Sequence, residues 1–65
     1  MTKLADRISQ IQSSLKGQEI SYNDAHQVLR ASEPSISPAR TNFTLDSMKK
    51  AGLIEATVPG KMIVK

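Results

Sequence analysis

The segment SPARTNFTLDSMKKAG, residues 37–52, holds the side chains of this chain best suited to chemistry, and that chemistry is recognition. It places a guanidinium, a carboxamide and an aromatic ring close together, at Arg40, Asn42 and Phe43. A guanidinium can pair with a guanine edge, and a carboxamide can pair with an adenine edge. An aromatic ring can lie against a thymine methyl group or wedge at a base step. These residue types match the readout of double-stranded DNA.

A helix over residues 38–51 would give this segment a buried and an outward face. Leu45 and Met48 fall on one side, and Phe43, the only phenylalanine, points the opposite way among polar side chains. By angular position, the outward face holds Ala39, Arg40, Asn42, Phe43, Asp46, Ser47 and Lys50. Thr41 and Thr44 flank the buried side, and we count Thr41 as a candidate phosphate contact.

Lysines complete the candidate DNA interface. Lys49 and Lys50 end the helix and Lys61 follows a Pro-Gly turn, so all three are candidate phosphate contacts. The predicted DNA-binding residues are Arg40, Thr41, Asn42, Phe43, Ser47, Lys49, Lys50 and Lys61. Two observations oppose this interpretation: Asp46 on the same face repels phosphate, and lysines at a helix end also serve simply to complement the helix dipole.

Phe43 leaves alternatives open. Its ring contacts DNA, packs against another part of the chain or a second subunit, or is simply exposed in part.

The first helix is predicted from about Thr2 to Lys16, with Thr2 as its cap and Gly17 just past its end. Leu4, Ile8, Ile11 and Leu15 recur at intervals of four, three and four residues, which makes one apolar stripe. The stripe suits either an intramolecular core or a coiled-coil dimer seam. The opposite face, which includes Arg7, is polar.

The second helix begins after Ser21, which forms a pair of capping-box type with Asp24. It should end by Ser32, because Glu33 precedes a proline and is pushed towards an extended conformation. His26 falls on its polar face, where we expect it to be solvated.

The third helix and the segment after it have clear boundaries. Ser37 is a good N-cap, Pro38 suits the first helical position, and Gly52 can end the helix in the left-handed conformation. The apolar period then changes, and residues 53–58 and 61–65 read as a β-hairpin. Pro59-Gly60 fits the centre of a type II turn, although a tight hairpin prefers other turns, so a wider loop is also expected.

Three helices followed by a hairpin, together with the motif LDSMKKAGLIEATVPGKMIV, resemble the winged helix-turn-helix superfamily of bacterial and phage transcription regulators. The resemblance covers about two-thirds of the chain, from EISYNDAHQVL onward. It rests on apolar residues seven and four before Gly52, a GLI leading into a strand, and a Pro/Gly/basic turn. It implies an α+β fold with a C-terminal two-stranded wing, as one domain over residues 1–65. The segment from Ala31 to Ser37 is longer than the family's usual tight turn.

Composition narrows the class of protein. The 65 residues carry a formal net charge of +3, no cysteine and one histidine, so a disulfide framework and a multi-histidine metal site are excluded. No nucleophile–base pair or Gly-rich phosphate loop is present, which argues against an enzyme, and no cofactor is expected. No apolar run suits a membrane span and no signal-peptide pattern opens the chain, so the expected compartment is the cytoplasm.

The sequence therefore predicts a small DNA-binding transcriptional regulator, such as a repressor of a bacterium, phage or plasmid. We expect it to bind double-stranded DNA as a homodimer or as several copies on a repeated site, with residues 38–51 in the major groove. The alternative is a protein-interaction module of the same fold, since folds do not determine function. An antirepressor, an adaptor, or the N-terminal domain of a larger replication or partition protein would fit it.

Overall fold

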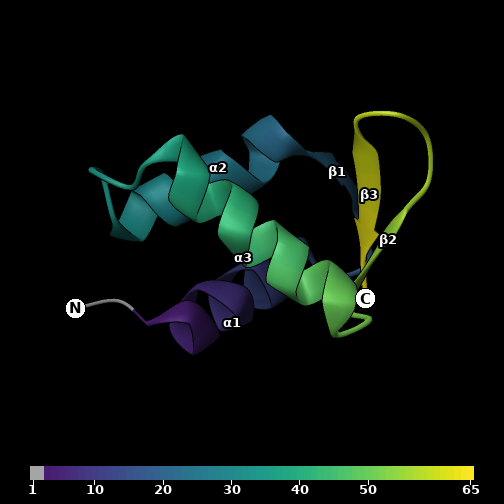
Figure 1. Ribbon diagram of the computed structural model, residues 1–65, viewed down its shortest axis with the longest axis horizontal. Coiled ribbons are helices and arrows are strands. Elements are labelled where there is room, and N and C mark those ends of the chain that lie inside the picture. The colour runs from purple at the N-terminus through teal and green to yellow at the C-terminus, as the bar shows by residue number, and fades with distance from the viewer. Residues whose placement is uncertain (1–2) are drawn as a thin grey trace.

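Three helices and a three-stranded antiparallel sheet form the α+β fold of residues 3–65, which are the residues that the computed structural model describes (Figure 1). The sheet lies against one end of the cluster of helices, beside the end of the third helix (Figure 1). In chain order the elements are α1 (Leu4–Leu15), β1 (Glu19–Ser21), α2 (Tyr22–Ser32), α3 (Pro38–Lys50), β2 (Ile54–Ala56) and β3 (Lys61–Val64).

Side-chain caps fix the starts of α2 and α3, as predicted. The Asp24 N–H donates to Ser21 Oγ at 3.4 Å, and the Ser21 N–H donates to the Asp24 carboxylate at 2.9 Å, which closes a capping box. The Arg40 N–H donates to Ser37 Oγ at 3.2 Å, and Pro38 is the first residue of α3. Helix α1 begins after Lys3 without a side-chain cap, and its predicted cap, Thr2, lies outside the described residues.

The helices end where backbone chemistry predicts. Glu33, before Pro34, has an extended φ of −134° and ψ of 78°, so α2 stops at Ser32. Gly52 follows α3 with a φ of 77°, a conformation that favours glycine over residues with a Cβ.

The sequence predicted a two-stranded hairpin, and the structure has a sheet of three strands in which this hairpin is joined by β1. Strand β1 pairs with β3, with Ile20 opposite Met62, and the strand order is β1-β3-β2. The hairpin itself is confirmed, and the loop between its strands is wider than two residues, spanning 57–60. The Lys61 N–H donates to the Val58 carbonyl at 2.9 Å around Pro59-Gly60, and the φ of Gly60 is 83°, as a type II turn requires.

The core gathers apolar side chains from every helix and strand. Its buried members are Ile11, Ile20, Ala25, Leu29, Ile36, Leu45, Met48, Ile54 and Val64. In the α1 stripe, Ile11 is fully buried and Ile8 and Leu15 pack against this core. Three of the four stripe residues therefore contribute to the intramolecular core.

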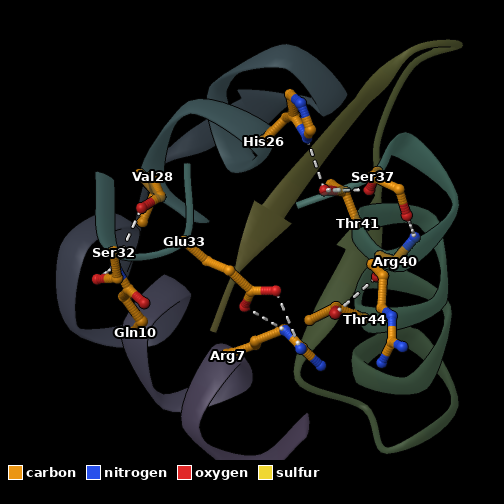
Figure 2. Close-up of polar contacts among 10 residues, drawn as sticks. All are labelled: Arg7, Gln10, His26, Val28, Ser32, Glu33, Ser37, Arg40, Thr41 and Thr44. Atoms are coloured by element: carbon orange, nitrogen blue, oxygen red, sulfur yellow. Dashed lines mark hydrogen bonds and ion pairs between the residues drawn. The ribbon is translucent and has the colours of Figure 1, made fainter. Parts of the chain in front are cut away.

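Arg7 lies where the polar face of α1 was predicted, yet it is buried. Its guanidinium Nε lies 3.1 Å from Glu33 Oε1, and a second nitrogen lies 3.3 Å from Oε2, so the pair is bidentate (Figure 2). The contact ties α1 to the segment that joins α2 to α3.

Between residues 3 and 65, no helix is both long and apolar enough to cross a membrane.

Candidate nucleic-acid interface

Helix α3 turns four residues into the protein and presents the remainder outward. The buried residues are Thr41, Thr44, Leu45 and Met48. Most of the predicted outward face is exposed, and Phe43 is 62% exposed, so its ring is not part of the core. Ser47 is half-buried at the margin of this face.

Thr41, one of the predicted DNA contacts, lies in the interior of the protein. Its side chain is fully buried, and its Oγ1 lies 2.6 Å from His26 Nδ1 and 3.5 Å from the Ser37 carbonyl oxygen (Figure 2). A hydroxyl enclosed between two helices cannot reach a phosphate, so the prediction for Thr41 is wrong. Its position on the flank of the helix allowed either assignment, and packing against α2 decides it.

His26 is likewise not the solvated side chain that was predicted. It is half-buried, and its ring stacks on Tyr22 with centroids 5.7 Å apart and planes inclined by 11°. The Tyr22 hydroxyl donates to the Pro38 carbonyl at 3.1 Å. The two rings thus hold the first turn of α3 against α2; this turn carries Arg40, and Asn42 follows directly after it. Polarity alone placed His26 outside, because periodicity does not show which polar groups find partners.

The exposed side of α3 has two flanks. Asn42 and Lys49 line an open groove between α3 and the β2–β3 hairpin, and Lys61 lines the same groove from the hairpin. Arg40 and Ser47 lie on the other flank. Arg40 is two positions before Asn42, and Ser47 is two positions before Lys49, and residues two positions apart on a helix point in divergent directions. Phe43 lies between the flanks. The predicted residues other than Thr41 therefore share one surface, but they do not converge on one point.

Free cations dominate this surface. Within residues 3–65, no hydrogen bond or ion pair engages the side-chain nitrogens of Arg40, Lys49 or Lys61. Asp46, which opposed the DNA interpretation, lies 3.3 Å from Lys50 in an exposed i,i+4 pair. The carboxylate that would repel phosphate is therefore offset by its neighbouring ammonium group.

Lys61 also faces an acidic neighbour. The Ser21 backbone N–H, and then the Ser21 hydroxyl, lower the pKa of Asp24 by hydrogen bonding, and the charge of Lys61 lowers it slightly further. Lys61 therefore lies near a carboxylate that stays ionised, which reduces the net positive charge near the tip of the hairpin.

The hairpin adds an exposed apolar side chain to this surface, which was not among the predicted site residues. Val58, just before the Pro-Gly turn, is 53% exposed. Its place beside the turn was the signal that would have identified it.

Among the described residues, no cluster of three or more metal-ligating side chains is present.

Comparison with protein-family models, with curated proteins and with solved structures finds no match to this chain. The arrangement of its residues must therefore carry any functional assignment.

Proposed function

We propose that this chain is a winged helix protein that binds double-stranded DNA in a sequence-dependent manner, as a small transcriptional regulator. Helix α3 would enter the major groove, and the β2–β3 hairpin would lie as a wing on the adjacent backbone. Strand β1 fits this fold as the third strand that supports the wing.

One observation carries the proposal: the first two turns of α3 project Arg40, Asn42 and Phe43 outward from a helix whose opposite side is locked into the core. The side chains that would contact bases lie on one face of α3, and the opposite face of this helix is buried in the core. Lys49 and Lys61 flank them, as phosphate contacts that position a recognition helix should.

The test replaces the readout groups together. We expect Arg40→Ala/Asn42→Ala to abolish the preference for a specific duplex over a shuffled one, measured by fluorescence anisotropy at about 50 and 200 mM salt. The duplexes are the DNA upstream of its own gene and a shuffled version of it. The matched control is Arg30→Ala/Asn23→Ala, which removes the same residue types from the exposed face of α2. Unchanged preference in the α3 variant would show that another face reads DNA.

The salt series provides a second readout. Each phosphate contact contributes about −0.9 to the slope of log affinity against log salt. Lys49→Gln and Lys61→Gln should each reduce that slope by about one while sequence preference survives. Equal, weak binding of wild-type protein to both duplexes would instead favour the protein-interaction module, which the exposed Phe43 also suits.

A further inference from the structure

Strand β2 has an open edge. In the sheet order β1-β3-β2, one side of β2 pairs with β3 and no described strand pairs with the other side. Figure 1 shows β2 on the side of β3 away from β1. Open edges of this kind are the surfaces on which sheets accept an additional strand.

The register shows which backbone groups this edge offers. The Thr57 N–H donates to the Lys61 carbonyl at 3.3 Å, and the Lys65 N–H donates to the Leu53 carbonyl at 2.9 Å. Backbone groups alternate in direction along an antiparallel strand, so odd-numbered residues of β2 face β3. Ile54 and Ala56 therefore direct their N–H and C=O groups away from the sheet. Ala56 is exposed, so a second chain can reach its groups.

The edge at β1 is different. There the Val64 N–H donates to the Gln18 carbonyl, so even-numbered residues face β3 and Ser21 directs its N–H outward. That N–H is already bound by the Asp24 carboxylate of the capping box at 2.9 Å. The capping box thus occupies the outward N–H of Ser21, and no such cap covers Ala56 among the described residues.

The groove between α3 and the hairpin adjoins the open edge. Ile54, Ala56 and Val58 line it from the hairpin, and alternation places the side chains of Ile54 and Ala56 on one face of β2. Leu45 lines it from α3, and Met62 lies on β3, which gives the groove an apolar floor. A chain added beside β2 would therefore place every second side chain over apolar surface.

Charge determines which chain fits. Lys49 and Lys61 line the groove from different elements, and neither ammonium group has an ion-pair partner within residues 3–65. Asp46 also lines the groove, but its carboxylate is paired with Lys50 at 3.3 Å. Glu55, whose side chain alternates to the other face of β2, is paired with Lys65. The groove therefore favours carboxylates over ammonium groups.

We propose that β2 binds an extended, acidic segment of a partner protein, which adds to the sheet as a fourth strand paired through Ala56. The path from Ile54 to Val58 accommodates about five extended residues at ~3.4 Å each. The groove-facing positions would carry an apolar residue in the middle and a carboxylate at each end, near Lys49 and Lys61. This site uses the backbone of β2, so it exists whether or not α3 reads DNA.

The experiment is an NMR titration of the ¹⁵N-labelled chain with the peptide acetyl-ETVTE-amide. We expect the Ala56 amide signal to shift and its hydrogen exchange to slow, because a new hydrogen bond protects it. The reversed-charge peptide acetyl-KTVTK-amide should not bind. Lys49→Gln and Lys61→Gln should each weaken binding by about two- to fivefold, as exposed ion pairs do. Lys16→Gln, an exposed lysine outside the groove, is the matched control and should change nothing.

Backbone pairing is tested separately. Ala56→Pro removes the outward N–H and should abolish binding, and edge strands tolerate proline where the N–H faces away from the sheet. An ETVTE peptide methylated on the central valine nitrogen tests the same pairing without altering the protein, and it should not bind. Three results would overturn the proposal: no shift at Ala56, equal binding by the methylated peptide, or a shift at Ala56 caused by duplex DNA but not by the acidic peptide.

Discussion

Arg7 is a charged side chain that is buried, and its ion pair with Glu33 joins two parts of the fold. The side chain of Arg7 is 7% exposed and that of Glu33 is 26% exposed, so both charged groups are largely shielded from solvent. Removing one partner leaves the other charge desolvated, which costs more than the pair itself contributes. We expect Glu33→Ala to lower the free energy of unfolding by about 2 kcal/mol in urea denaturation.

The exposed pair Asp46–Lys50 provides the control for that measurement. Its side chains are mostly exposed, and pairs of this kind contribute at most ~0.5 kcal/mol. Asp46→Ala should therefore leave the urea midpoint almost unchanged. Equal losses in the two variants would mean that burial of Arg7 has no energetic consequence.

Thr41 provides a second test at the scale of the residue, because a core role and a DNA role predict different results. Thr41→Val keeps the shape but removes the hydroxyl that meets His26 Nδ1. We expect a loss of about 1–2 kcal/mol in the free energy of unfolding, since a half-buried ring nitrogen loses its partner. The salt dependence of DNA affinity should stay at the wild-type slope. A reduced slope with unchanged stability would restore Thr41 as a phosphate contact.

At the scale of the element, the cap of α2 links helix stability to pH. Hydrogen bonds from Ser21 hold the pKa of Asp24 below its ordinary value in the folded state. The unfolded chain therefore binds a proton at a higher pH, and the stabilisation is complete above the unfolded pKa and is lost as pH falls through the folded pKa. Asp24→Asn removes this contribution.

Urea denaturation from about pH 5 down to pH 2 measures the effect. We expect the wild-type protein to be more stable than Asp24→Asn at the upper end, and we expect the difference to shrink towards the lower end. Comparing the two proteins cancels the contributions of the other carboxylates. A difference that stays constant with pH would show that the charge of Asp24 does not stabilise the cap.

The elements also show what the sequence could and could not reveal. Local chemistry predicted the helix boundaries, because Ser21, Ser37 and Gly52 act through their own backbone neighbours. Strand β1 was not predicted, because its three residues form a strand only by pairing with β3, whose residues lie 40 to 44 positions further along the chain (Ser21–Lys61 and Glu19–Ile63). The outward face of α3 followed from periodicity, whereas the burial of Arg7, His26 and Thr41 depended on partners in other elements.

At the scale of the whole molecule, the size of the chain and its exposed aromatic surface bear on how many copies would take part in the proposed DNA binding. A single small module buries only ~600–1,000 Å² on DNA, whereas specific interfaces bury ~1,000–2,500 Å², so we expect more than one copy at a site. Most of the apolar stripe of α1 is used in the core, which leaves Phe43 as the exposed aromatic side chain available to a partner. Its neighbours on α3 are charged, and one ring supplies far less than the ~1,000 Å² of a stable interface. We therefore expect the free chain to be monomeric.

Phe43→Ala tests where that ring makes its contact. In the absence of DNA, we expect the variant and the wild type to sediment alike as monomers. On DNA, the variant should lose about 10- to 150-fold in affinity, because burying a phenylalanine contributes about 1.5–3 kcal/mol. Phe43→Leu, which keeps an apolar group, should recover part of the loss. If the wild type sediments as a dimer and Phe43→Ala as a monomer, the ring belongs to a subunit contact. Wild-type affinity and sedimentation in the variant would instead mean that Phe43 contacts neither DNA nor a second copy.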